Sequence, residues 1–181
     1  MPGEEGAWLF IFGDMIVFAI FFVTFVYYRA QQVELYDLSQ LALNQVFGLV
    51  NTLLLLTSSW FLAMAVRAFR SGDAQLSRRL IGMTMLFGAG FVFSKGLEWT
   101  DKITHGVTVM TSEFFMFYFM FTGIHLVHVL IGLGVLGYLF AQTGCAGDVA
   151  GRIGAVESGA AFWHLVDLLW VVLFALIYLM R

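Results

Sequence analysis

Two pairs of ionisable residues share one spacing within strongly apolar stretches of the sequence. His125 and His128 are three residues apart, and so are His164 and Asp167. On a helix, residues three apart occupy neighbouring positions of one face. Neutral imidazole with carboxylate is a common ligand set for metals, and the same groups can pass protons. Asp14, in another apolar stretch, could join them. These residue types allow a metal site, a proton path, or a polar network that only holds helices together.

The polar network is the simplest of these interpretations. An ionisable side chain in hydrocarbon costs about 2.5–3.5 kcal/mol on insertion scales, so each one needs a partner or a function. We expect a structural network of interhelical hydrogen bonds, without a metal. Its predicted members are His125, His128, His164 and Asp167. An alternative is a stand-alone intramembrane metal-dependent enzyme using the three histidines, and another is a small proton-coupled carrier using Asp14 and Asp167.

A second polar group is predicted at the other end of the apolar stretches. Lys95 and Glu98 are three residues apart where one stretch ends, and Glu113 stands where the next begins. We expect these three side chains to form an outer polar group that supports packing. No residue of either group is expected to be catalytic.

The composition places these residues in a membrane protein. Of 181 residues, 61% are hydrophobic and only 12% are charged, whereas a soluble domain averages about 25% charged residues. Nine basic residues face twelve acidic ones, and no long run of Lys or Arg is present, which excludes a nucleic-acid partner. Cys145 is the single cysteine and cannot form an intramolecular disulfide. We therefore expect one integral membrane domain over residues 1–181.

Five apolar stretches are each long enough to cross a bilayer as a helix, which needs about 20 residues. They cover about residues 8–28, 48–69, 80–99, 112–141 and 158–180. The fold class is therefore all-α, a polytopic bundle of five transmembrane helices. Residues 29–46 mix polar and apolar positions and suit a connection lying along the interface. Trp163 and Trp170, seven residues apart, predict a stripe facing lipid or a neighbouring subunit.

The basic residues predict the orientation of the bundle. The turn between the second and third helices carries four arginines, and the segment before the first helix carries no basic residue. Cytoplasmic connections carry an excess of Lys and Arg, so this turn is expected inside the cell. With five spans, the N-terminus is then cytoplasmic and the C-terminus lies outside. Asp14, His128, His164 and Asp167 fall in the cytoplasmic half.

Taken in order, the five stretches resemble the five-helix bacterial form of haem-copper oxidase subunit III over nearly the whole chain. The matching segments are WLFIFGDMIVFAIFF, NTLLLLTSSWFLAMA, GAGFVFSKGLEW, FTGIHLVHVLIG and FWHLVDLLWVVLFALIYLM. The last two are the most specific, because each joins rare intramembrane His or Asp residues to a fixed apolar frame.

The resemblance implies an accessory subunit of a respiratory complex in the bacterial cytoplasmic (inner) membrane. It implies no cofactor in this chain, with haem and copper or iron held by a catalytic subunit I-like partner, beside other subunits and membrane lipids. Asp14 matches a carboxylate near the entrance of the partner's proton uptake path. Cytochrome c oxidase, quinol oxidase and nitric oxide reductase branches all stay open. Bound phospholipid is an open expectation, because the two further helices that form a lipid-holding cleft in seven-helix members have no counterpart here.

Overall fold

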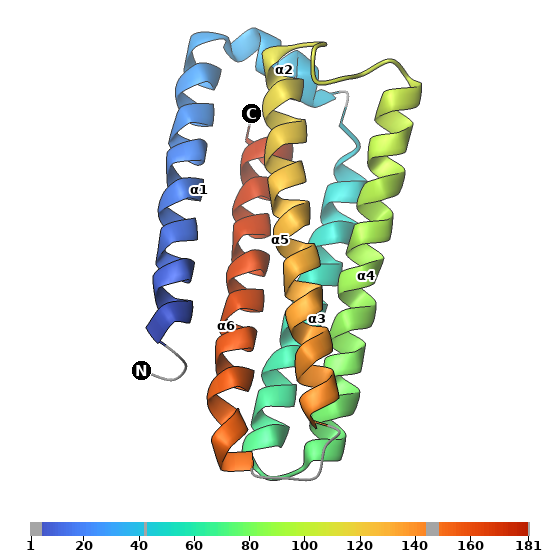
Figure 1. The fold of residues 1–181 in the computed structure, drawn as a ribbon. Coiled ribbons are helices and arrows are strands. Elements are labelled where there is room, and N and C mark those ends of the chain that lie inside the picture. The colour runs from blue at the N-terminus through green and yellow to red at the C-terminus, as the bar shows by residue number, and fades with distance from the viewer. Residues whose placement is uncertain (1–4, 42, 144–148, 181) are drawn as a thin grey trace.

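The computed structural model describes residues 5–41, 43–143 and 149–180, and this part of the chain is built from helices (Figure 1). The elements are α1 (Glu5–Gln31), α2 (Val33–Leu41), α3 (Gln45–Arg70), α4 (Ala74–Thr104), α5 (Glu113–Thr143), α6 (Val149–Phe174) and the π-helical segment η1 (Ala175–Leu179). All but α2 and η1 are long, and α6 runs directly into η1. Five helices are long and apolar enough to cross a membrane, which confirms the predicted number of spans.

Most of these helices extend beyond the apolar stretches that predict them. The third predicted span, residues 80–99, lies inside the 31-residue helix α4. Asp73 caps this helix, since its carboxylate accepts a hydrogen bond from the backbone N–H of Leu76 at 2.9 Å. At about 1.5 Å per residue such a helix exceeds the roughly 30 Å of hydrocarbon. Apolar composition therefore marks the hydrocarbon crossing, whereas the caps determine where a helix ends.

The long helices alternate in direction through the bundle (Figure 1). The start of α1, the α3–α4 turn, the end of α5 and the start of α6 lie at one end, which we call the N-terminal end. α2, the α4–α5 connection and η1 lie at the other end, which we call the α2 end. The alternation places the four arginines of the α3–α4 turn, which is predicted to be cytoplasmic, at the N-terminal end together with Arg152 near the start of α6.

Helices α3 to α6 form the packed bundle, and α1 stands to one side of it (Figure 1). α3 and α4 pack along most of their length, and α6 contacts both α3 and α5. α1 contacts mainly α6 and α2. Its outer side is apolar and open, as Leu9 and Val23 are 78% and 69% exposed. This side is left for lipid or for another protein.

Two tryptophans of α6 lie inside the bundle, so the prediction that they face lipid is wrong. Trp163 is 1% exposed and Trp170 is fully buried. The indole of Trp163 lies against Gly88 of α4 and Gly132 of α5, where an added Cβ would come within 2.8 and 2.7 Å of ring atoms. Trp170 donates its indole N–H to Thr52 Oγ1 at 3.1 Å. Both rings pack toward the inside of the bundle because the neighbouring helices offer them small and polar residues. The sequence of α6 alone does not show these residues, which lie on other helices.

Candidate functional site

Asp14 of α1 and His128 of α5 face each other across the gap between these helices. Asp14 Oδ2 lies 3.1 Å from His128 Nε2, and the two side chains are 17% and 14% exposed. The other ring nitrogen of His128, Nδ1, lies 2.8 Å from the backbone carbonyl of Ile124. Because a carbonyl oxygen only accepts hydrogen bonds, Nδ1 must carry the hydrogen. In the neutral ring, Nε2, the nitrogen that faces Asp14, therefore carries no hydrogen.

Asp14 and His128 are in close contact, but Asp14 Oδ2 has no hydrogen-bond partner within the described part of the chain. The ring of Phe18 stands edge-on to the imidazole, with centroids 5.4 Å apart, and it limits access of water from one side.

His164 and Asp167 meet at a second cluster, which joins α6 to α3 through Ser59. Ser59 Oγ lies 2.5 Å from His164 Nδ1, and Asp167 follows His164 by three residues along α6. Asp167 is 7% exposed, and its Oδ1 has no hydrogen-bond partner. We call these three residues the serine–histidine–aspartate cluster. The predicted site residues did not include Ser59, because a serine in an apolar stretch gives no signal of its own.

His125 belongs to neither cluster, although it is three residues from His128. Its ring is fully buried between the rings of Phe91 and Trp170, at centroid distances of 5.6 and 5.2 Å. Neither of its ring nitrogens has a hydrogen-bond partner within the described part of the chain. The structure thus places the histidines of α5 and α6 in separate surroundings. Over residues 5–41, 43–143 and 149–180, no three His, Cys, Asp or Glu side chains are grouped to hold a metal ion.

Lys95 and Glu98 form a buried ion pair near the α2 end. Lys95 Nζ lies 2.9 Å from Glu98 Oε2, and the two side chains are 0% and 1% exposed. Tyr118 and Tyr178 each donate a hydroxyl hydrogen to Glu98 Oε1, at 2.8 and 2.5 Å. Lys95 donates in turn to both hydroxyl oxygens, at 3.3 and 3.0 Å. We call these four residues the lysine–glutamate network, and each charge in it is hydrogen-bonded.

The structure does not bring Glu113 to this network. Its carboxylate accepts a hydrogen bond from Gln32 Nε2 at 3.1 Å, close to α2. There, burial and the negative charge of Glu113 raise the pKa of Tyr36 to about 12. The predicted outer polar group is therefore divided between two places. Tyr118 and Tyr178 complete the buried part and were not predicted, although a tyrosine hydroxyl in a buried position needs a partner.

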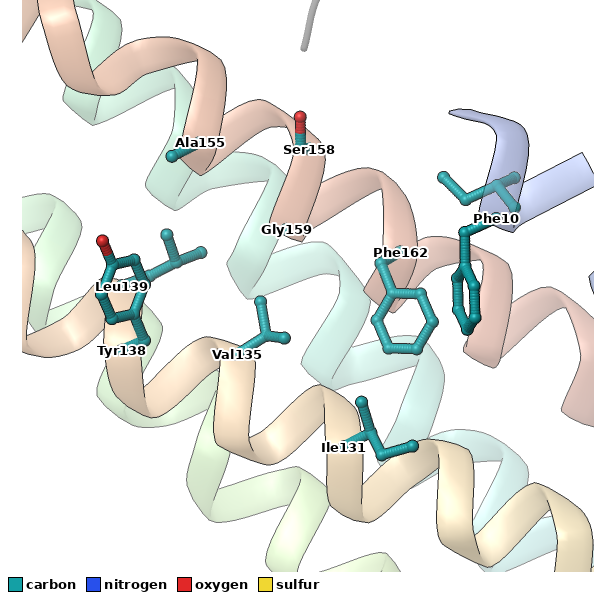
Figure 2. A pocket seen from close by; sticks show the side chains of 10 residues that line it. Phe10, Ile131, Val135, Tyr138, Leu139, Ala155, Ser158, Gly159 and Phe162 are labelled. Carbon is teal, nitrogen blue, oxygen red and sulfur yellow. The ribbon is translucent and has the colours of Figure 1, made fainter. Parts of the chain in front are cut away.

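A cavity of about 480 Å³ lies between α1, α5 and α6 (Figure 2). Figure 2 shows Val135 between the two walls, with Phe10 and Phe162 side by side at one end. The rings of these two phenylalanines are 5.9 Å apart. Most of the lining is apolar, namely Phe10, Ile11, Ile131, Val135, Leu139, Ala155, Gly159 and Phe162, with Tyr138 and Ser158 as the polar members. A second cavity shares Tyr138, Leu139 and Ala155 with it and reaches Arg152.

Comparison with known protein families matches residues 4–181 to the family described as "Cytochrome c oxidase subunit III". The chain belongs to this family. The subunit III chain is thus a multi-pass membrane protein of the respiratory chain, and the resemblance stated from its motifs is confirmed. The family belongs to the haem-copper cytochrome c and quinol oxidases.

Similar proteins from three bacteria cover almost the whole subunit III chain. "Probable cytochrome c oxidase subunit 3" of Mycobacterium leprae is 31% identical over 176 residues, 97% of this chain and 87% of the relative. "Cytochrome bo(3) ubiquinol oxidase subunit 3" of Pseudomonas aeruginosa is 30% identical over 178 residues, 97% of this chain and 83% of the relative. "Quinol oxidase subunit 3" of Bacillus subtilis is 26% identical over 181 residues, 97% and 85% of the two chains.

Proposed function

We propose that this subunit III stabilises a catalytic haem-copper subunit I-like partner and supports proton uptake by that partner through Asp14. The Asp14–His128 pair is the observation that carries the proposal. Haem and copper belong to the partner, and this chain contributes packing and proton transfer. The printed names of the relatives favour a cytochrome c or quinol oxidase over a nitric oxide reductase.

The proposed orientation has the N-terminal end of the bundle facing the cytoplasm of a bacterial cell. Positive charge supports it, because the arginines of the α3–α4 turn and Arg152 share this end, and basic residues are favoured on the cytoplasmic side. Asp14 then lies about 13 Å along α1 from its cytoplasmic start. A carboxylic acid at this depth is within reach of water at the interface and is still inside the membrane.

The position of α1 supports a role of Asp14 toward another subunit. α1 contacts the rest of the bundle mainly through α6 and α2, and its outer side is open. A partner that packs on this side lies next to the pair. His128 lies next to Asp14 on the bundle side, with Nε2 3.1 Å from Oδ2. Asp14 is therefore placed to exchange a proton between water and the partner, without catalysing a reaction itself.

The proposal predicts a pH-dependent defect in Asp14→Asn. Asn keeps the shape and hydrogen bonding of the side chain but cannot titrate, so proton delivery loses this donor. Turnover of the intact complex should fall below the parent as pH rises, because protons become scarcer, with a limit on the order of tenfold per pH unit where uptake limits the rate. The measurement is oxidase turnover against pH at equal content of assembled complex.

Asp37→Asn is the matched control for this experiment. Asp37 lies in α2 and pairs with Arg29 at 2.9 Å, away from the proposed proton path. Its pH profile should follow the parent. A fully assembled Asp14→Asn complex whose profile overlays the parent would leave Asp14 with a packing role only.

We also propose that the cavity between α1, α5 and α6 holds one acyl chain of an anionic phospholipid. The lining is apolar, the volume falls within the range of natural ligand sites, and Arg152 of the adjoining cavity offers a charge for the phosphate.

Val135→Trp fills the cavity (Figure 2) and should lower the amount of co-purified phospholipid by one per subunit. Quantitative lipid analysis of the purified complex measures this, with Val127→Trp on the exposed side of α5 as control. Equal lipid content in all three proteins would refute the site.

A further inference from the structure

The end of the helix formed by α6 and η1 presents backbone carbonyl groups that need donors. η1 is π-helical, and Met180 donates its N–H to the carbonyl of Ala175, five residues earlier, at 2.9 Å. The last carbonyl groups of a helix have no partner within the helix and must find donors elsewhere. Figure 1 shows α2 and the start of α3 at the same end of the bundle as η1. Side chains of these two elements can supply the missing donors.

Two glutamines donate to these carbonyl groups. Gln40 Nε2 of α2 donates to the carbonyl oxygen of Ile177 at 3.0 Å and to that of Leu176 at 3.4 Å. Gln45 Nε2, in the first residue of α3, donates to the carbonyl oxygen of Tyr178 at 3.3 Å. A glutamine amide carries two N–H hydrogens, so Gln40 can serve both of its carbonyls at once. We call Gln40 and Gln45 the glutamine clamp.

Gln40 is turned into the bundle, where a polar side chain needs a reason to be. α2 buries Tyr36 and Gln40, which lie one turn apart on one face. The ring of Tyr36 packs between Phe25 of α1 and Phe114 of α5, with centroids 5.5 and 5.6 Å away. Gln40 is 7% exposed, and its Oε1 has no hydrogen-bond partner within the described part of the chain. Burying an amide costs free energy unless it is hydrogen-bonded, so the two N–H donors are what this position uses.

The clamp holds the backbone of the residue whose side chain completes the lysine–glutamate network. The Tyr178 hydroxyl donates to Glu98 and accepts from Lys95. A π-helical turn contains one residue more than an α-helical turn, so it changes the direction in which the following side chains point. Gly48 of α3 leaves room for the ring, since a Cβ added there would lie 2.9 Å from Tyr178 Cδ1. The direction of Tyr178 thus depends on how η1 is held.

We propose that the glutamine clamp fixes η1 in its π-helical form and thereby holds the Tyr178 hydroxyl in the lysine–glutamate network. Gln40 and Gln45 are positioning residues, because they bind the backbone of η1 and act on the network through Tyr178. When the clamp opens, the end of η1 frays and Tyr178 leaves Glu98. The clamp therefore connects α2, which lies outside the five candidate membrane spans, with a charge pair buried in the bundle. The inference does not depend on the proposed role of Asp14.

Hydrogen–deuterium exchange of the backbone amides of residues 175–180, followed by mass spectrometry on the purified complex, tests the clamp. Gln40→Met keeps the length of the side chain and removes its donors. One hydrogen bond changes a local equilibrium by about 2- to 13-fold, so the loss of both Gln40 bonds should speed this exchange by about tenfold. In Gln40→Lys the ammonium group can donate to the same carbonyls at the helix end, so slow exchange should return.

Nitration of Tyr178 by tetranitromethane, located by mass spectrometry, reports on the network itself. In the parent this side chain is 2% exposed and bonded to Glu98, so it should react slowly. Gln40→Met should raise its nitration by about tenfold, because local opening of η1 becomes more frequent by that factor. Gln31→Met makes the same chemical change at an exposed residue at the end of α1 and should leave both readouts unchanged.

Two results would overturn the clamp. One is parent-like exchange and nitration in Gln40→Met, which is the behaviour of a side chain that only fills space. The other is a Gln40→Lys protein that behaves like Gln40→Met, because the donors would then have no effect. Should Gln40→Met fail to assemble, Gln45→Met removes one bond at an exposed position and should speed exchange of the same segment by about threefold. An unchanged rate in that variant would contradict the clamp as well.

Discussion

Lys95→Met is expected to lower the free energy of unfolding of the subunit by about 3–5 kcal/mol, which is typical of removing one partner of a buried ion pair. The variant leaves Glu98 as a buried charge that only the two tyrosine hydroxyls compensate. Water cannot replace the ammonium group, because the site is closed. The measurement is the unfolding free energy in mixed detergent micelles, together with the yield of assembled complex.

Two further variants test the reason for this loss. In Lys95→Met with Glu98→Gln the lysine–glutamate network holds no charge, and the glutamine oxygen can still accept from Tyr118 and Tyr178, so much of the stability should return. Arg79→Met removes an exposed positive charge from the same helix and should change stability by less than about 0.5 kcal/mol. Equal losses in the single and double variants would show that packing of the lysine stem, rather than the uncompensated charge, is responsible.

Gly132→Val should be the most disruptive small-to-large change in α5. An added Cβ would lie 2.7 Å from Trp163 Cε3, and on the α4 side Gly88 is also so close that a Cβ added there would lie 2.8 Å from another atom of the same ring. The indole therefore has no free side toward which it can move. Overpacking of a well-packed core costs about 1–3 kcal/mol and occasionally more, and we expect the upper part of this range.

Gly134→Val is the matched control on the same helix. An added Cβ there meets no atom within 4 Å, whereas the change in helix propensity is the same. Unfolding in detergent should separate the two variants by at least about 2 kcal/mol. If they unfold alike, the close approach of α5 and α6 at Trp163 does not contribute to stability.

The membrane-spanning helices could be predicted from the sequence because crossing hydrocarbon leaves a long apolar signature. Helix ends could not be read from the same signal. α4 extends through charged residues on both sides of its apolar stretch, and Asp73 determines where it begins. A helix cap is a local hydrogen bond between a side chain and the backbone. A hydropathy profile carries no information about such bonds and therefore does not locate the helix ends.

The partners of the polar residues depend on how helices face each other, and the sequence contains that information only weakly. The spacing of His164 and Asp167 predicts a common face, and in the structure Ser59 of α3 lies 2.5 Å from His164 Nδ1. The same spacing separates His125 and His128 by about 60° around α5. This angle is sufficient to turn His125 toward Phe91 and Trp170, while His128 faces α1.

The position of α1 has a consequence for biosynthesis. The ribosome makes α1 well before α6, the helix on which it packs, and α6 is finished roughly 140 residues later, which corresponds to on the order of 10 s of translation. During that interval the α3–α4 hairpin can already pack, whereas α1 crosses the bilayer with most of its surface in lipid. Docking of α1 is therefore a late event in the membrane. A catalytic partner that arrives during translation meets α1 before α1 has packed against α6.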